Sequence, residues 1–311
     1  MARSEVFSDM DQLKRYDRLR SDGKPKSLGS SVIKIEGMYK SGKSALGTDC
    51  PYATILHCPE GKLVSPFERA QVYEVPDYKT LQEMVGSFLE VAKKIRTKRG
   101  PRMMFFDPLK IIEQWLIADE VARYNRVQRR KLDMEIEAGE ATEEQWKYIK
   151  AKHIADVREY GTWDRIGSAM RELFLPFTGY GWGVGLIVHY KKKMLPFEGG
   201  RPGGTAWLPE ISPSLDSEIN KFIDVRIVAS KDVVASDSGR AQTSYRLEFE
   251  SAKSDEIGSR VPLRGSVEVP NYFDKREIAG VSAWTKLEQA YALGIKRLEI
   301  HKTRHSKARR K

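Results

Sequence analysis

The 311-residue chain has few of the features that mark secreted, membrane-spanning or zinc-binding proteins. Its two cysteines, Cys50 and Cys58, are too few for a disulfide framework or a four-thiolate zinc site, and they suit a reducing compartment. The five histidines and two cysteines show no C-x-x-C or H-E-x-x-H spacing. No run approaches about 18 apolar residues, and the first residues include no apolar signal-peptide segment. We therefore expect a cytoplasmic protein that does not span a membrane.

Acidic residues are also in deficit, because 54 Lys and Arg stand against 43 Asp and Glu and leave a formal net charge of +11. Such an excess favours a polyanionic partner, nucleic acid first and a membrane surface second. Hydrophobic residues make up 40% and charged residues 31% of the chain, which is an ordinary globular composition. The length allows one large α/β domain or two small ones.

Strand and helix patterns alternate along most of the chain. Strands are expected at 32–35, 52–58, 70–75, 102–107, 184–189, 222–229, 244–250 and 264–269, and helices at 77–96, 163–175 and about 282–293. This alternation predicts an α/β fold with a mainly parallel central sheet. The polar residues 1–30 are expected to form a flexible arm, residues 31–270 the core, and residues 271–311 a C-terminal helix with a tail.

Two charged segments interrupt the alternation. Residues 120–160 are charged and poor in glycine, so they predict a helical hairpin inserted into the core, the alternative being an ordinary solvated surface. Residues 301–311 contain six Lys or Arg and no acid, and we expect this basic tail to be disordered.

The chain matches the phosphate-binding pattern G-x-x-x-x-G-K-[ST] in full between a predicted strand and a predicted helix. Backbone N–H groups of such a P-loop surround phosphates, Lys43 reaches the β/γ oxygens, and the Ser44 hydroxyl binds Mg²⁺. The alternative is a glycine-rich turn without a ligand. The predicted ATP-binding residues are Gly37, Met38, Tyr39, Lys40, Ser41, Gly42, Lys43, Ser44 and Ala45.

Three more polar side chains follow predicted strands. Asp107 ends an apolar strand where a P-loop protein needs a carboxylate for Mg²⁺, the alternative being a strand-end cap. Glu60 follows the second strand, where a carboxylate can orient and deprotonate the attacking water, although a solvated turn glutamate is the simpler alternative. His189 ends the 184–189 strand and faces the ligand crevice, unless it is only a satisfied core histidine.

The order of these motifs over about residues 31–263 resembles the core of RecA-like ATPases, and more narrowly the phage RecA-like proteins of single-strand annealing and recombination. The resemblance implies that Glu60 activates water, that Asp107 is associated with magnesium, and that His189 senses the γ-phosphate. The usual Asp-x-Glu reads Cys58-Pro-Glu60 here, and the charged insertion is unusually long.

The same resemblance implies that the segment after the His189 strand contacts DNA. Its cations would neutralise phosphates and its aromatic rings would stack on bases, whereas the alternative is a flexible solvated loop. The candidate single-stranded DNA contacts are Tyr190, Lys191, Lys192, Lys193, Phe197 and Arg201. In a homo-oligomeric filament or ring, Lys253 or Arg260 would reach the γ-phosphate of a neighbouring subunit; otherwise both are surface cations.

The sequence therefore predicts a RecA-like P-loop NTPase with ATP and Mg²⁺ as ligands, coupled to single-stranded DNA in phage recombination or annealing. The alternatives are a helicase or loader with the same core, a nucleotide kinase, and a module that binds ATP as a switch without turnover. The basic loop and basic tail argue against the kinase.

Overall fold

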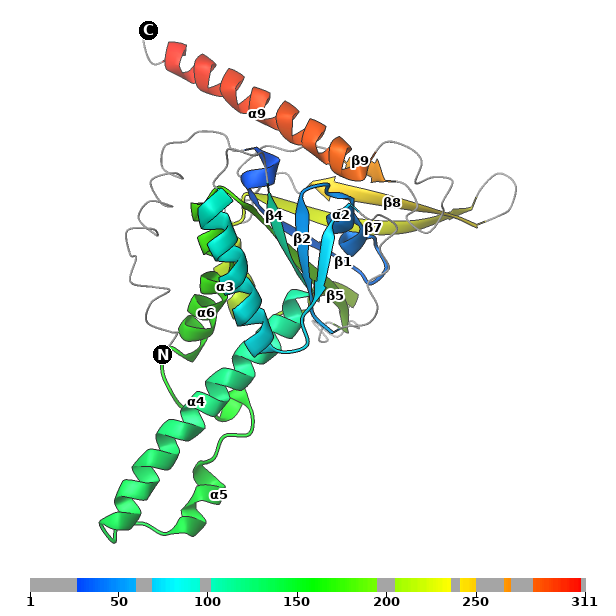
Figure 1. Cartoon of the computed structure of the whole chain (residues 1–311). Coiled ribbons are helices and arrows are strands. Elements are labelled where there is room, and N and C mark those ends of the chain that lie inside the picture. The colour runs from blue at the N-terminus through cyan, green and yellow to red at the C-terminus, as the bar shows by residue number, and fades with distance from the viewer. Residues whose placement is uncertain are drawn as a thin grey trace.

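The computed structural model describes residues 27–59, 69–95, 102–194, 205–235, 241–249, 266–269 and 282–308, and the statements on structure below concern these residues. They form a nine-stranded sheet with helices on both faces (Figure 1). The strands are β1 (Val32–Gly37), β2 (Ala53–His57), β3 (Gln71–Glu74), β4 (Met103–Asp107), β5 (Gly183–Met194), β6 (Thr205–Pro209), β7 (Val225–Ala235), β8 (Ala241–Phe249) and β9 (Ser266–Val269).

The strand order is β3-β2-β4-β5-β1-β7-β8-β9, and β6 pairs with β5 outside this path. The six strands from β3 to β7 in this order are all parallel to their neighbours. The strands β8, β9 and β6 are added in antiparallel pairs. The predicted α/β class with a mainly parallel sheet is therefore confirmed. Parallel strands end at one edge of a sheet, so the residues that follow β1, β2 and β4 share that edge.

Two apolar cores lie on the two faces of the sheet, because neighbouring residues of a strand point to opposite sides. In β4, Met104 and Phe106 pack in the core that α3 (Tyr78–Ile95), α4 (Leu109–Glu137), α6 (Thr162–Gly179) and α7 (Pro213–Asn220) cover. Met103 and Phe105 belong to the opposite core, beneath α2 (Lys43–Asp49) and α9 (Ala283–Ala308). There the ring of Phe105 meets the fully buried Trp284 edge-on, with ring centroids 6.0 Å apart.

The charged insertion differs from the helical hairpin that we expected. One 29-residue helix, α4, starts two residues after Asp107 and projects away from the sheet (Figure 1). The chain returns through the short elements η2 (Glu143–Gln145), α5 (Trp146–Ile149) and η3 (Ile154–Asp156) instead of a second long helix. Asn125 joins the two by a pair of 2.9 Å hydrogen bonds to the backbone of Ala151.

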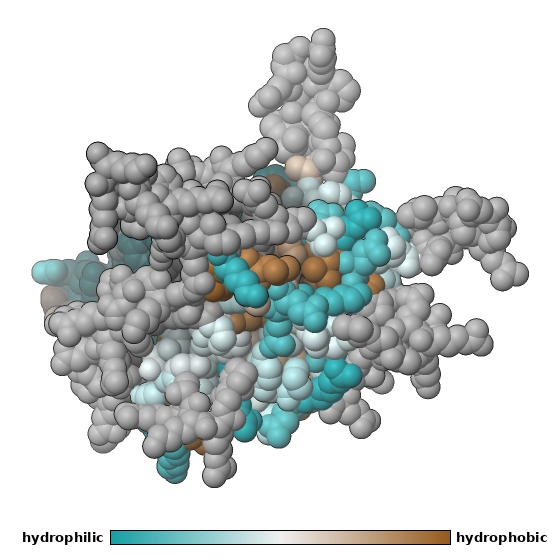
Figure 2. Space-filling model, turned by 90° about the horizontal axis from the view of Figure 1, so that it is seen from above, coloured by the Kyte–Doolittle hydropathy of each residue, from teal (hydrophilic) through white to brown (hydrophobic). Residues whose placement is uncertain are grey.

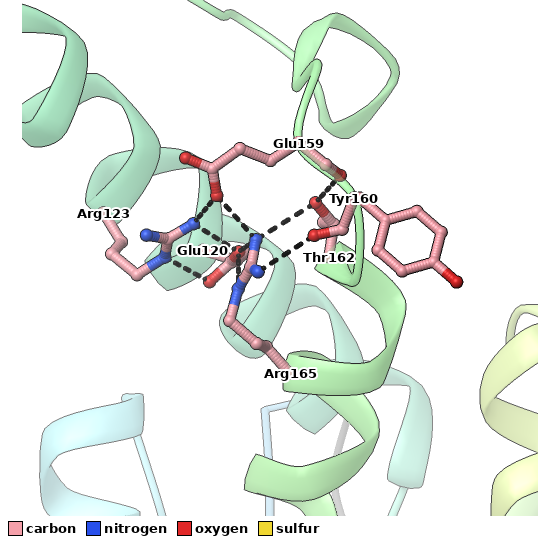
Figure 3. A network of polar contacts seen from close by, with 6 residues as sticks. All are labelled: Glu120, Arg123, Glu159, Tyr160, Thr162 and Arg165. Carbon is pink, nitrogen blue, oxygen red and sulfur yellow. Dashed lines mark hydrogen bonds and ion pairs between the residues drawn. The ribbon is translucent and has the colours of Figure 1, made fainter.

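A network of charges fixes the base of this projection, where α4 meets α6 (Figure 3). The buried Glu120 carboxylate accepts hydrogen bonds from Arg123 at 2.9 Å and from Arg165 at 2.7 Å. Both arginines also contact Glu159, which lies just before α6. Burial opposes ionisation of Glu120, but the two arginines outweigh it and lower its pKa. The insertion is therefore tied to the core at its base.

The terminal segments are more ordered than predicted. Leu28, in η1 (Leu28–Ser30), is buried in the α2/α9 core, so residues 28–30 are not part of a flexible arm, whereas residues 1–26 of the expected arm lie outside the described residues. The helix α9 continues to Ala308, so most of the tail that we expected to be disordered is helical. On the face that carries α9, seen from above in Figure 2, apolar side chains gather in a band between hydrophilic ones.

Candidate nucleotide-binding site

The predicted phosphate-binding loop joins β1 to α2, and its backbone needs glycine at two positions. Gly42 precedes α2 with φ of 87°, in the left-handed region that glycine adopts without strain. Gly37 has φ of 152°, and a Cβ atom there would lie 2.2 Å from the backbone oxygen of Ala229. Lys40 also has a left-handed φ, of 61°. The loop is therefore a tight turn that connects β1 to α2 and lies against Ala229 of β7.

The Lys43 ammonium lies inside this loop. The residue is only 2% exposed, and its Nζ donates to the backbone oxygens of Gly37 at 2.9 Å and Met38 at 2.5 Å. It also lies 3.4 Å from Ser41 Oγ. Lysine is rarely buried, and the backbone oxygens that Lys43 contacts are neutral acceptors. Phosphate oxygens in the loop would provide a stronger, charged acceptor for the same ammonium.

Asp107 ends β4 with a carboxylate that is 1% exposed. Its Oδ2 atom has no hydrogen-bond partner among the described residues and lies 3.7 Å from Nδ1 of His57, the neighbouring residue of β2. Buried carboxylate oxygens are nearly always hydrogen-bonded or bound to a cation. This orphaned oxygen therefore fits a site that binds a cation.

The residues at this edge suit Mg²⁺ that arrives with a nucleotide. No group of three or more His, Cys, Asp or Glu that could hold a metal occurs in the part of the chain that the structure describes. Magnesium in nucleotide sites needs no such cage, since one or two protein oxygens, phosphates and water complete its shell. Asp107 and the half-buried Ser44 are the side chains that would hold it.

His189 lies level with Gly37 in the β1–β5 register, so it stands at the mouth of the loop. Its ring stacks on that of Tyr39, with centroids 4.3 Å apart and planes at 8°. Burial and then the nearby Lys43 lower the pKa of His189 to about 4, although Asp107 and Glu210 oppose the shift. The imidazole is therefore neutral at physiological pH, so one of its nitrogens can donate a hydrogen bond and the other can accept one.

Glu210 is a site residue that sequence reasoning missed. Its carboxylate accepts a 2.7 Å hydrogen bond from the Tyr39 hydroxyl and pairs with Lys110 at 2.6 Å. Its backbone N–H donates to the backbone oxygen of His189 at 2.7 Å. Glu210 follows β6, a strand that we had not predicted, and 100 residues separate it from Lys110. No local pattern marks such a residue, because only the pairing of β5 with β6 brings it to the loop.

Sequence reasoning also missed a cluster of buried charged side chains on the face of β1 that α7 covers. Lys34 and Glu36 are fully buried and lie 2.5 Å apart, and Lys34 pairs at 2.5 Å with Asp216 of α7. Glu36 also contacts Arg226 of β7 and accepts a 3.2 Å hydrogen bond from Tyr190. Alternation of polar and apolar residues usually marks a strand with one solvated face, but α7 covers that face here.

The segment expected to be a loop begins as a β-hairpin arm. Residues 190–194 extend β5 and pair with β6, so Lys192 lies opposite Trp207 and Lys191 opposite Leu208. The three lysines at 191–193 are exposed, as is Trp207 at 48%. Tyr190, by contrast, is half-buried with its hydroxyl on Glu36, so it is not one of the exposed groups of this β5–β6 arm.

Several predicted residues lie outside the described part of the chain, namely Glu60, Phe197, Arg201, Lys253 and Arg260. Their predicted roles in water activation, DNA contact and the neighbour's active site stay predictions. The structure does bring together the loop 37–45, Asp107 and His189 at one edge of the sheet.

Comparison with known proteins assigns the chain to no family. No family model matches it, and a sequence search finds no curated protein that matches. None of the helices in the described ranges is long and apolar enough to cross a membrane.

Proposed function

We propose that this chain is a RecA-like P-loop ATPase that binds and hydrolyses Mg²⁺-ATP, binds single-stranded DNA, and acts as a homo-oligomer in phage recombination or annealing. The observation that carries the nucleotide part is that two buried groups of opposite charge lie at one sheet edge. These are the Lys43 ammonium inside the loop and the Asp107 carboxylate, whose Oδ2 has no hydrogen-bond partner among the described residues. A magnesium–phosphate group would offer an anion to the ammonium and a cation to the carboxylate.

The sheet order supports separate roles for the residues that β1, β4 and β5 bring to this edge. Strand β5 lies between the loop's strand β1 and the Asp107 strand β4, so His189 stands between the phosphate loop and the carboxylate. In this proposal Lys43 binds the β/γ oxygens, Ser44 and Asp107 hold Mg²⁺, and Glu60 takes the proton of the attacking water. The neutral His189 would form a hydrogen bond that depends on the γ-phosphate.

The nucleotide part is tested by Lys43→Ala, with Lys40→Ala as the matched control. Both substitutions remove one lysine charge from the same loop, but Lys40 is exposed and Lys43 is buried. Loss of a charge-assisted contact should weaken binding of a fluorescent ATP analogue by about 10- to 150-fold in Lys43→Ala only. Equal affinities of the two variants would refute the P-loop assignment.

The DNA part rests on the β5–β6 arm, which carries adjacent lysines on one strand and an exposed tryptophan on the other. Lysines neutralise phosphates without regard to sequence, and an aromatic face stacks on any base. Trp207 therefore joins Lys191, Lys192 and Lys193 as a proposed contact to single strands.

Salt dependence tests this arm quantitatively. Alanine at positions 191–193 should lower the log–log salt slope of single-strand binding by about 2, or about 0.7 for each phosphate contact. The matched control removes three exposed lysines of the insertion, Lys147, Lys150 and Lys152, for the same change in charge. If both triple variants change the slope equally, net charge and not the arm explains the binding.

A further inference from the structure

Lys110 lies in the first turn of α4, three residues after Asp107, and therefore at the same sheet edge as the phosphate loop. Its Nζ pairs with Glu210 Oε1 at 2.6 Å, and the two side chains are only 25% and 14% exposed. The other oxygen of the same carboxylate accepts from Tyr39, a residue of the loop. The Glu210 carboxylate thus lies between the Lys110 ammonium and the P-loop and contacts both.

Glu210 is held firmly in this position. Its N–H donates to the backbone oxygen of His189, and the pairing of β6 with β5 fixes the residue just before it. The Tyr39 ring in turn stacks on His189. Both Lys110 and Lys43 contribute to the lowered pKa of His189, so two lysines act on one imidazole. The loop, the β5–β6 arm and α4 therefore meet at this carboxylate.

Glu210 is poorly suited to deprotonate water. Although burial opposes its ionisation, hydrogen bonds from Lys110 and Tyr39 prevail and lower its pKa. A general base at neutral pH needs a raised pKa and an oxygen turned to the water. Both oxygens of Glu210 already accept hydrogen bonds from protein groups. A role as counter-ion to Lys110 explains the arrangement better.

We propose that Lys110 is a second cation for the terminal phosphate of a nucleoside triphosphate, supplied by the same subunit as the P-loop, and that Glu210 positions it. The inference rests on the proposed function. A triphosphate carries more negative charge than Lys43 and Mg²⁺ neutralise together, and in the transition state the charge of the transferring γ-phosphoryl group is spread over its three equatorial oxygens. Lys110 forms no covalent bond and only contributes its charge.

The test compares Lys110→Met with Lys110→Arg in the full chain, by steady-state ATP hydrolysis and by ATP binding. Removal of one cation from a phosphoryl-transfer site should lower kcat by about 10²- to 10³-fold. The KM should change much less, since Lys43 stays in place, and Lys110→Arg should recover part of the kcat. The matched control is Lys93→Met, which breaks a pair of the same 2.6 Å length with Glu90 on the remote helix α3.

The Glu210→Gln variant separates a positioning residue from a base. The amide can still hydrogen-bond Tyr39 but holds the Lys110 charge less tightly, so kcat and KM should each change by less than tenfold. A loss of kcat of about 10²-fold or more in Glu210→Gln would assign water activation to Glu210 and overturn its positioning role.

Subunit mixing tests whether Lys110 acts within its own subunit. Lys43→Ala and Lys110→Met damage the same site, so their mixture should stay inactive at every ratio, once co-assembly is shown. Recovery of hydrolysis would place Lys110 in a neighbour's site and overturn the proposal. So would a Lys110→Met kcat equal to that of the Lys93→Met control. If the unmodified chain binds no ATP, the proposed function itself fails, and that result is distinct from these.

Discussion

Substitution of Asp107 by asparagine should stabilise the protein while impairing its magnesium-dependent nucleotide binding. The carboxylate is 1% exposed and its Oδ2 has no hydrogen-bond partner among the described residues. A buried polar group without a partner costs about 1–3 kcal/mol, and more if it is charged. The amide has the same shape, carries no charge, and can turn its Nδ2 donor toward His57, 3.7 Å away. We therefore expect the free energy of unfolding without ligand to rise by about 1–3 kcal/mol.

When Mg²⁺ and ATP are added, Asp107→Asn should instead have the lower free energy of unfolding of the two proteins. A ligand at about 1,000 times its Kd stabilises the folded state by about 4.1 kcal/mol, which exceeds the roughly 1–3 kcal/mol expected from the substitution. Asp107→Asn should lose most of this gain in Mg²⁺, because a neutral amide oxygen binds the cation more weakly than a carboxylate. Urea denaturation of both proteins, with and without Mg²⁺-ATP, measures all four free energies.

A structural role for Asp107 predicts the opposite result. If the carboxylate only caps the strand end, Asp107→Asn should destabilise the protein and leave the Mg²⁺-ATP increment unchanged. That pair of results would refute the cation-site argument. Glu74, an exposed acid at the end of β3, which β2 separates from β4, provides the control substitution Glu74→Gln.

The remaining predictions concern single groups. The pKa of His189 is about 4 in the folded state and 6.5 in the unfolded state, so its contribution to stability is complete above pH 6.5. This contribution, at most about 3 kcal/mol, is lost as the pH falls from 6.5 through 4. Urea denaturation of His189→Gln at a series of pH values should lack this loss. Glu60→Gln should keep ATP affinity and lower turnover by roughly 10²- to 10⁴-fold, and normal turnover would assign water activation elsewhere. If Lys253 or Arg260 acts in a neighbour's site, its alanine variant mixed with Lys43→Ala should recover hydrolysis, whereas no recovery despite co-assembly would contradict that role. Arg165→Ala leaves the buried Glu120 with one arginine fewer, so limited proteolysis should cut the insertion faster than in an Arg171→Ala control. Equal cleavage rates would show that Arg165 does not hold the base of the insertion.

The part of the site that sequence reasoning found is local in origin. The loop 37–45 has a backbone that requires glycine at defined positions, so its pattern can be read directly. The strand before Asp107 is a continuous apolar run, which is typical of a strand buried on both faces. His189 was found because an apolar run also precedes it. Each of these signals lies within about ten neighbouring residues.

The residues that were missed depend on pairings between distant segments. Glu210 reaches Tyr39 across 171 positions, and Glu36 reaches Arg226 across 190. Residues 190–194 were expected to belong to a loop because the resemblance places a DNA-contacting loop after the His189 strand, yet pairing with β6 makes them extended. The tail was expected to be disordered because of its charge, although its lysine, arginine and alanine residues are good helix formers.

By itself, the sequence determined the elements that carry their own signal: the strands other than β6, the phosphate loop, and the carboxylate and imidazole that end two apolar runs. Hydrophobic periodicity and glycine stereochemistry act over a few residues, so they are legible without the fold. The tertiary structure alone decided which charges are buried and which meet. Strand order places β5 between β1 and β4, α7 buries Lys34 and Glu36, and the return of β6 brings Glu210 to Lys110. The charge balance of the site depends on these long-range packings, because burial and proximity, not residue type, determine what a charged group can do.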